Sequence, residues 1–167
     1  MNRKRISDFN LLVEKHNREI YAYLWRMLRD PLDAEDALQE SFLRAFRGFP
    51  YLKNEDNLRA WFYKIATNVA YTYLKQRTLH ENRTAELDEA SSPAFQPNPD
   101  QAEIMEAVRI AVESLPQKQR AALVLRNYQG FEYTESAQIL KCSEDTARAN
   151  VYQALKKLRN LFAEEAK

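Results

Sequence analysis

The chain has 167 residues, of which 45% are hydrophobic and only 2 are glycine. This length allows one domain or two small ones, and scarce glycine with abundant Leu, Ala, Glu, Lys and Arg favours helices over sheets. The single cysteine, Cys142, excludes an internal disulfide and a multi-cysteine zinc cluster. No apolar run is long enough to span a membrane, and no apolar segment follows the basic start. We therefore expect a cytoplasmic protein without a secretory signal or membrane insertion.

The formal net charge of +1 conceals an uneven distribution along the chain. Residues 1–80 hold 14 Lys and Arg against 10 Asp and Glu, residues 81–103 hold 1 against 6, and residues 104–167 hold 10 against 8. An acidic connector thus joins two basic halves.

The first predicted helix covers residues 7–29. Apolar residues recur along it at spacings of three and four, Ser7 is suited to the N-cap, and Asp30-Pro31 stops the helix. His16 falls in the apolar stripe, and no His and carboxylate cluster with metal-ligand spacing accompanies it. We expect this side chain to be packed or hydrogen-bonded rather than to bind a metal ion.

A second helix is predicted within residues 32–50, capped by Asp33 and closed by Gly48 and Pro50. Its outer side carries an acidic patch with a basic end: Asp33, Glu35, Asp36, Gln39, Glu40 and Arg44. Paired carboxylates can serve acid/base catalysis or hold a metal, but no Glu-x-x-His motif or second acidic cluster completes such a site. Helix capping together with protein docking is the interpretation that we favour.

A long third helix is predicted from Asn57 to Arg77, fading beyond Thr78. One side is an apolar stripe that predicts a core contact: Leu58, Trp61, Phe62, Ile65, Ala66, Val69 and Tyr73. The other sides mix cations, amides and rings without an acidic residue: Arg59, Tyr63, Lys64, Asn68, Tyr71, Lys75, Gln76 and Arg77. Cations bind phosphates, rings stack on unpaired bases and amides can read base edges, so this surface suits a partly single nucleic-acid strand. An ordinary solvated helix is the alternative.

Residues 81–99 are predicted to be a flexible acidic linker, because they contain Ser-Ser-Pro and Pro-Asn-Pro and lack an apolar period. The expected architecture is therefore all-α, with two small helical domains, residues 1–80 and 100–167.

Four helical segments are predicted in the second domain. The first covers residues 100–114, and the next is opened by Pro116 and ended by Gly130. A short helix at residues 133–140, a tight turn and a longer helix reaching about Phe162 then form a helix-turn-helix signature. Residues 146–160 hold 4 Lys and Arg and no Asp or Glu, as expected of a recognition helix; a basic helix in a plain bundle is the alternative.

Three stretches together resemble the extracytoplasmic-function (ECF) subfamily of bacterial RNA polymerase sigma factors. DAEDALQESFLRAF at residues 33–46 is similar to the family's polymerase-binding region, and residues 57–77 resemble its promoter-melting region. LPQKQRAALVLRNYQGFEYTESAQIL and DTARANVYQALKKLR resemble its carboxy-terminal promoter-binding domain. The resemblance implies a protein without an enzymatic site or cofactor that binds core polymerase and promoter DNA, both duplex and melted. It also allows for an anti-sigma factor as a partner and a monomer when free.

The resemblance also implies roles for individual residues. The resemblance assigns core polymerase binding to Asp33, Glu35, Asp36, Gln39 and Phe42. The resemblance assigns minus-ten DNA binding to Tyr51, Lys53, Asn57, Arg59, Tyr63, Lys64 and Asn68. It places Asn68 near the captured minus-ten base, and the loop from Tyr51 to Asn57 forms the other wall of the pocket for that base. Minus-thirty-five DNA binding falls on Thr146, Arg148, Ala149, Asn150, Tyr152, Gln153, Lys156 and Lys157.

Several positions depart from the family pattern. Lys141 and Asp145 stand where the family usually has Gly, Ala149-Asn150 where it has Ser-Arg, Ser136 where it favours Ile, and Gln153 where it favours Arg. These changes remove cations from the DNA-reading face, so the promoter preference cannot be copied from the family.

Two other functions compete with this interpretation. A helix-turn-helix regulator that is not a sigma subunit accounts for the second half but leaves the acidic patch and the aromatic-basic helix unexplained. A helical enzyme has the least support, because no nucleophile, base or metal constellation surrounds the carboxylates.

Overall fold

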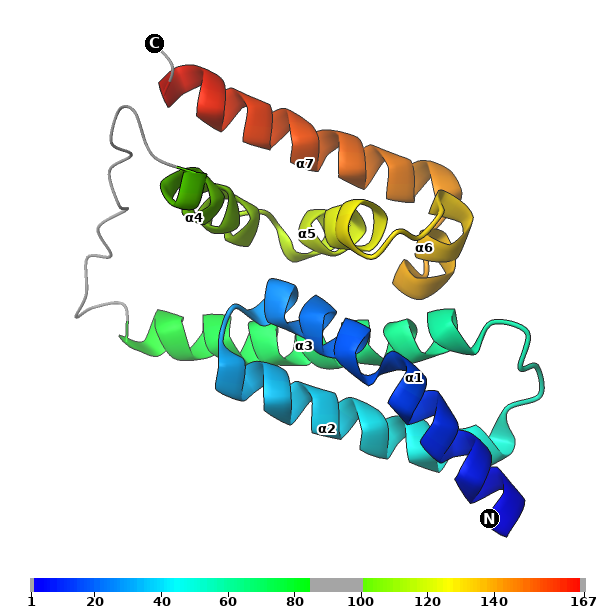
Figure 1. The fold of residues 1–167 in the computed structure, drawn as a ribbon. Helices are drawn as coiled ribbons and strands as arrows, with labels where there is room; N and C mark the ends of the chain where they lie inside the picture. Colours follow the sequence, from blue (N-terminus) through cyan, green and yellow to red (C-terminus); the bar gives the residue numbers. More distant parts are fainter. Residues whose placement is uncertain (1, 85–100, 166–167) are drawn as a thin grey trace.

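The computed structural model describes residues 2–84 and 101–165, and every regular element in these two ranges is a helix (Figure 1). The elements are α1 (Arg3–Leu28), α2 (Pro31–Gly48), η1 (Phe49–Tyr51), α3 (Leu58–Thr84), α4 (Gln101–Glu113), α5 (Gln117–Leu123), η2 (Val124–Tyr128), α6 (Tyr133–Leu140) and α7 (Glu144–Glu165). The predicted all-α class with two helical domains is confirmed. We call residues 2–84 the N-terminal unit and residues 101–165 the C-terminal unit.

The predicted linker, residues 81–99, lies outside the described residues from position 85 onward. Its first four positions belong to α3, which continues past Thr78 to Thr84. Among the described helices, none is both long and apolar enough to cross a membrane.

The first two helices begin earlier than the sequence predicted. The N-cap of α1 is Asn2, whose side chain accepts a hydrogen bond from the Arg5 N–H, so the prediction of Ser7 as the cap was wrong. The N-cap of α2 is Asp30, which accepts from the Asp33 N–H at 2.9 Å, so the prediction of Asp33 was wrong too. Proline lacks an N–H and has a helical φ, which makes Pro31 a suitable first residue and shifts the cap back to its neighbour.

The N-terminal unit is a three-helix bundle in which α3 packs on both α1 and α2. Phe42 of α2 meets Phe62 of α3 edge-on with ring centroids 5.3 Å apart. His16 is buried and hydrogen-bonded through Nδ1 to Glu19 at 2.6 Å, as expected. Ala66 and Val69 continue the buried stripe along α3, so the apolar period located this part of the core correctly.

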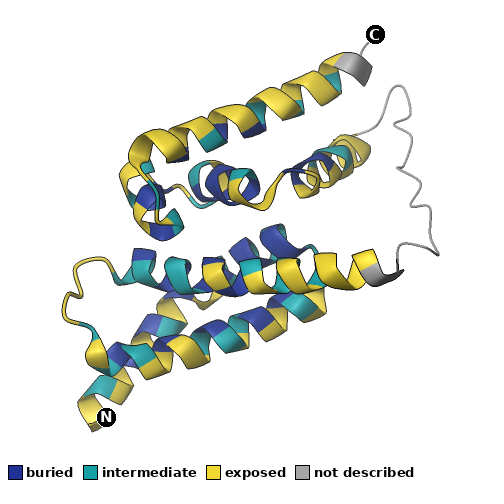
Figure 2. Ribbon diagram, turned by 180° about the vertical axis from the view of Figure 1, so that it is seen from behind, coloured by how far each residue is buried: buried dark blue, intermediate teal, exposed yellow. Residues whose placement is uncertain are grey.

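The C-terminal unit contains the helix-turn-helix in α6 and α7. Both helices pack on α5, and the outer side of α7 is exposed along most of its length (Figure 2). Between α5 and α6, the chain continues as the π-helical η2 and turns at Gly130, whose φ of 74° suits glycine. This turn places Phe131 back toward the N-terminal unit, with its N–H bonded to the Leu125 carbonyl at 3.0 Å.

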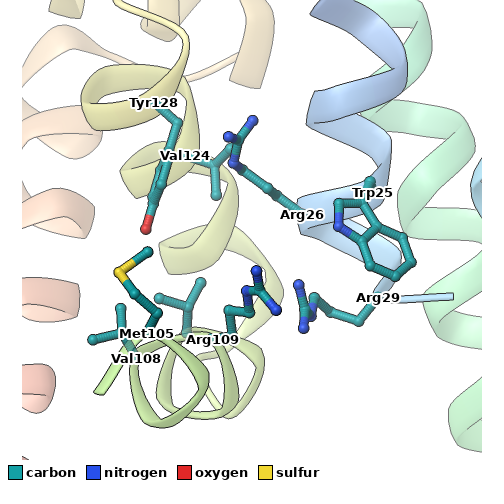
Figure 3. A pocket seen from close by; sticks show the side chains of 9 residues that line it. Trp25, Arg26, Arg29, Met105, Val108, Arg109, Val124 and Tyr128 are labelled. Carbon is teal, nitrogen blue, oxygen red and sulfur yellow. The ribbon is translucent and has the colours of Figure 1, made fainter. Parts of the chain in front are cut away.

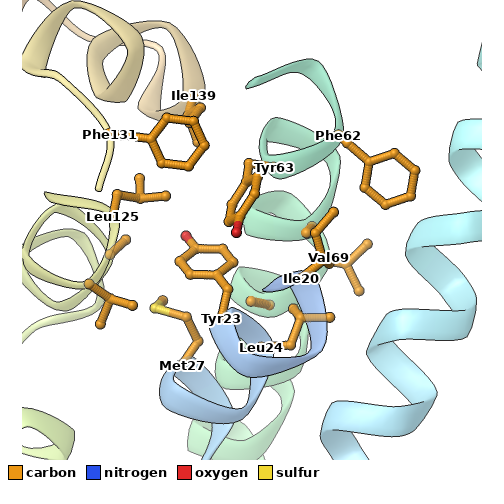
Figure 4. Close-up of a cluster of buried hydrophobic side chains, with 14 of the residues drawn as sticks. Ile20, Tyr23, Leu24, Met27, Phe62, Tyr63, Val69, Leu125, Phe131 and Ile139 are labelled. Carbon is orange, nitrogen blue, oxygen red and sulfur yellow. The ribbon is translucent and has the colours of Figure 1, made fainter. Parts of the chain in front are cut away.

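The two units share one core. Tyr63 of α3 meets Phe131 with ring centroids 4.7 Å apart and Tyr23 of α1 at 5.1 Å (Figure 4). The Tyr23 hydroxyl is paired with Thr67 at 2.8 Å, and Ile139 of α6 closes the cluster. All these rings are fully buried, so the α3 side away from α2 is a packing surface for the C-terminal unit.

The buried Arg120 side chain satisfies free carbonyls at the C-terminal ends of both α1 and α4. Arg120 of α5 donates to the carbonyls of Met27 at 2.6 Å, Leu115 at 3.3 Å, and Glu113. Burial lowers the pKa of Arg120, the charge of Glu113 raises it, and other guanidinium groups lower it further. A cation at a helix C-terminus interacts favourably with the helix dipole, so this buried charge ties the two units together.

We expect Arg120→Met to lower the free energy of unfolding by about 1–3 kcal/mol, because it leaves buried carbonyl oxygens unpaired. Urea unfolding followed by circular dichroism measures the change. Lys118→Met, on the exposed side of the same helix, is the matched control. Equal stabilities of the two variants would contradict this role for Arg120.

Candidate nucleic-acid and protein interfaces

The outer surface of α2 combines carboxylates with apolar side chains. Glu35, Asp36 and Gln39 are exposed, as predicted. Leu32 is 71% exposed and Leu43 52% exposed, and they lie four residues from Asp36 and Gln39 respectively, on the same side of the helix. These leucines were not among the predicted binding residues, although their spacing relative to the acidic residues places them on the same side of the helix. We call Leu32, Glu35, Asp36, Gln39, Leu43 and the exposed Phe46 the α2 surface.

Two of the residues predicted for polymerase binding also hold α2 against the rest of the unit. Asp33 is paired with Arg77 of α3 at 2.7 Å, and Phe42 is half-buried against Phe62. Burial raises the pKa of the neighbouring Tyr73; the charges of Asp36, Asp33 and Glu40 raise it further, and the charge of Arg44 opposes them. The α2 surface can therefore offer both apolar area and negative potential to a protein partner.

Most of the predicted minus-ten residues are exposed, whereas Arg59 and Tyr63, described below, are covered by other parts of the chain. Tyr51 is 83% exposed, and Lys53, Asn57 and Asn68 are exposed as well. Lys64 is half-buried.

The loop before α3 is held at both ends. The Asn57 side chain accepts from the Ala60 N–H at 3.0 Å and so caps α3. Arg5 of α1 donates to the Pro50 carbonyl at 2.6 Å and to Glu55 at 3.2 Å, a contact that the sequence did not reveal. These bonds position Tyr51 and the loop beside the start of α3.

Tyr63 lies in an environment opposite to the one predicted from the sequence. It was predicted to lie on a face open to nucleic acid, but it is fully buried between Tyr23 and Phe131. Burial, followed by the negative charge of Glu19, raises its pKa well above the ordinary value. A single apolar stripe was assumed for α3, whereas two sides of this helix are covered by different neighbours.

Arg59 lies in the same contact between the units. It donates to both carboxylate oxygens of Glu19, at 2.9–3.1 Å, and to the Gln129 carbonyl at 2.9 Å. Its guanidinium is 3.9 Å from the ring centroid of Phe131. The Gln129 amide in turn donates to the Tyr63 hydroxyl at 2.9 Å. We call Glu19, Arg59, Tyr63, Gln129 and Phe131 the interdomain cluster.

Electrostatics favour the charged forms of Glu19 and Arg59 in this cluster. Burial raises the pKa of Glu19, but hydrogen bonds from Arg59 and His16 and the charge of Arg59 lower it more, so the net shift is downward. The hydrogen bond to Glu19 raises the pKa of Arg59, and burial opposes that shift. Both groups therefore remain ionised at neutral pH.

The exposed surface of α7 carries nearly all of the predicted minus-thirty-five residues. Thr146, Arg148, Ala149, Tyr152, Gln153, Lys156 and Lys157 are exposed, and Asn150 is half-buried. The preceding turn is made by Lys141 with a φ of 54°, a conformation usually taken by glycine, and Ser143 caps α7 by accepting from the Thr146 N–H at 3.1 Å.

Arg148 has local partners on the same helix. It is paired with Glu144 at 2.8 Å and lies 3.6 Å from Asp145, and its guanidinium is 4.9 Å from the Tyr133 ring centroid. These carboxylates compete with any phosphate or base for Arg148. Within residues 2–84 and 101–165, no three His, Cys, Asp or Glu side chains gather as a metal site.

Each of the two units matches a known protein family region. Residues 12–79 match the model of sigma-70 region 2, and residues 105–158 match that of sigma-70 region 4. The RNA polymerase sigma-H factor of Pseudomonas aeruginosa is 29% identical over 157 residues, 87% of this chain and 81% of the relative. The ECF RNA polymerase sigma-E factor of Salmonella typhimurium is 29% identical over 164 residues, 91% and 85% of the two chains.

Solved structures share the fold. The sigma factor RpoE of Bartonella quintana, in complex with the anti-sigma factor NepR, aligns with a TM-score of 0.74 at 23% identity, covering 93% of this chain and 97% of that one. CnrH, in complex with the cytosolic domain of CnrY, aligns with a TM-score of 0.69 at 18% identity, covering 93% and 88%.

The order of regions 2 and 4 defines a sigma-70-type protein. This chain belongs to the ECF family of RNA polymerase sigma factors.

We expect Glu19→Gln to weaken the interdomain cluster and to lower the free energy of unfolding by about 1 kcal/mol at neutral pH. The pKa of Glu19 is lowered on folding, so its contribution is present above the ordinary value of 4.5 and is lost as the pH falls through the folded-state pKa. Native protein should therefore lose more stability on acidification than Glu19→Gln. Urea unfolding, measured from neutral pH to below 4.5, tests this difference. The exposed Glu14→Gln variant is the control. Parallel profiles of unfolding free energy against pH for native protein and Glu19→Gln would contradict the role of Glu19.

Proposed function

We propose that this chain carries core RNA polymerase to its promoters through three surfaces. The α2 surface binds the polymerase, the Tyr51–Asn57 loop with Asn68 captures an unpaired base of the minus-ten element, and α7 reads the minus-thirty-five element. The protein works in the cytoplasm without a catalytic site of its own. The observation that carries the proposal is the presence, on one chain, of an exposed acidic and apolar helix and a helix-turn-helix with a basic outer face.

The α7 side chains divide by their place along the helix. Arg148, Asn150 and Gln153 lie in its N-terminal half, where side chains of a recognition helix reach base edges. Lys156 and Lys157 lie further along, where contacts to phosphate position the protein without reading sequence. Because Arg148 is paired with Glu144, duplex binding has to replace an ion pair at this position.

The packing of the two units opposes promoter opening. Arg59 and Tyr63 are engaged by Gln129 and Phe131 of the C-terminal unit, so neither is available to DNA in this arrangement. We propose that the units separate when polymerase binds, which uncovers this side of α3. A protein partner that keeps the units packed would act as an anti-sigma factor.

Polymerase docking is tested by charge reversal on the α2 surface. Glu35→Lys combined with Asp36→Lys should reduce the affinity for core polymerase about tenfold or more, because complementary charge speeds encounter and sets the register. Affinity is measured by fluorescence anisotropy of labelled protein. Asp8→Lys with Glu14→Lys makes the same charge change on exposed positions of α1 and should bind normally. Failure of native protein to bind core polymerase would favour a regulator that is not a sigma subunit.

Base capture is tested with Asn68→Ala and Tyr51→Ala. An amide can bond a base edge and a ring can stack on a base for roughly 1–3 kcal/mol, so both variants should slow open-complex formation while polymerase binding is kept. Permanganate footprinting follows strand opening. Gln76→Ala, exposed two turns further along α3, is the control.

A promoter with a mismatched bubble gives the deciding comparison for these variants. It removes the cost of opening the duplex but still presents the base. Both variants should hold this bubble less well than native protein. Native-like transcription from bubble and duplex alike would show that the base is captured elsewhere.

A further inference from the structure

A cavity of about 160 Å³ lies between the two units, away from the three surfaces described above. It is formed by the C-terminal end of α1, by α4 and by η2 (Figure 3). Its lining includes the apolar side chains of Met105, Val108 and Val124. Three guanidinium groups also line it, from Arg26 of α1, from Arg29, the C-cap of α1, and from Arg109 of α4.

The two guanidinium groups from α1 lack a carboxylate partner among the described contacts. Arg26 is 4.6 Å from the Tyr128 ring centroid and has a long hydrogen bond, 3.5 Å, to the Gln129 amide oxygen. Arg29 is 5.0 Å from the Trp25 ring centroid, and its Nε is buried without a hydrogen-bond partner. Ring contacts hold both side chains in place but leave N–H donors available.

The third guanidinium comes from the opposite unit. Arg109 is paired with Glu106 at 3.1 Å, on an exposed part of α4. Figure 3 shows the ends of Arg109 and Arg29 pointing toward one another across the cavity. Arg29 also acts on Arg120 of α5: burial is the main cause of the lowered pKa of Arg120, the charge of Glu113 opposes the shift, and the charges of Arg77 and Arg29 add to it.

Like charges that converge from two units repel each other unless an anion lies between them. We propose that this cavity binds a small, multiply charged oxyanion of the phosphate or pyrophosphate class. Guanidinium groups match the oxygens of such anions with paired N–H donors. The volume is below the range of roughly 300–1,000 Å³ typical of sites for larger organic ligands, which favours a compact anion over a nucleotide.

The same anion bridges the two units, because Arg26 and Arg29 belong to one and Arg109 to the other. Its binding therefore stabilises the packed arrangement. The anion stabilises the packed units of the free protein. This effect is therefore independent of whether the chain docks on polymerase as proposed above.

Isothermal titration calorimetry with sodium pyrophosphate, free of divalent cations, tests the site. Native protein should bind one equivalent saturably, beyond any effect of sodium chloride at matched ionic strength. Arg29→Gln and Arg109→Gln should each weaken binding about tenfold or more, because each removes charge-assisted hydrogen bonds. Arg18→Gln, an exposed position of α1 away from the cavity, is the control and should bind like native protein. Absence of saturable binding, or equal affinity of the Arg18 and Arg29 variants, would overturn the proposal.

Charge reversal provides a second test that does not depend on measured affinity. Arg109→Glu places a carboxylate opposite Arg29 and so supplies the missing negative charge from the chain itself. Pyrophosphate should raise the melting temperature of native protein and leave that of Arg109→Glu unchanged. An equal rise in both proteins would overturn the site, and circular dichroism confirms that the variant is folded.

Discussion

The contact of Phe131 with Tyr63 and Arg59 determines how the two units of this sigma factor are arranged. Phe131 is fully buried, edge-on to the Tyr63 ring and in contact with the guanidinium of Arg59. The contact depends on the turn at Gly130, which returns the chain from η2 toward α3. Because Arg59 is also bonded to Glu19 and Gln129, apolar packing and an ion pair act at the same place.

This arrangement gives two sides of α3 different packing roles. The apolar side of the helix packs within the N-terminal unit. The side with Arg59 and Tyr63 is the packing surface for the C-terminal unit. Separation of the two units exposes aromatic surface and removes hydrogen-bond partners from Arg59. It therefore costs free energy, which a binding partner has to offset. Polymerase and promoter binding can provide that free energy, whereas ligands of the packed form increase the cost.

The sequence predicted most of the helices and the α7 surface because each depends on local patterns. Apolar spacing locates the buried side of α2 and α7, and the short helix, turn and long helix follow from positions 133–162. Tyr63 was misplaced because no local pattern shows that Phe131, in the distant turn between η2 and α6, covers it. The caps at Asn2 and Asp30 were missed for a simpler reason, since several polar residues near each helix start were equally suitable. Leu32 and Leu43 were overlooked because only the charges on that side of α2 were considered.

The distance between the two units, in the free protein and on polymerase, tests the central claim most directly. Spin labels at Asn17→Cys on α1 and Asn160→Cys on α7, both exposed, in a chain with Cys142→Ser, report this distance by pulsed electron paramagnetic resonance. A single distance in the free protein that lengthens on binding core polymerase is the predicted result. Identical distance distributions in the two states would contradict it, because the covered side of α3 would then never open.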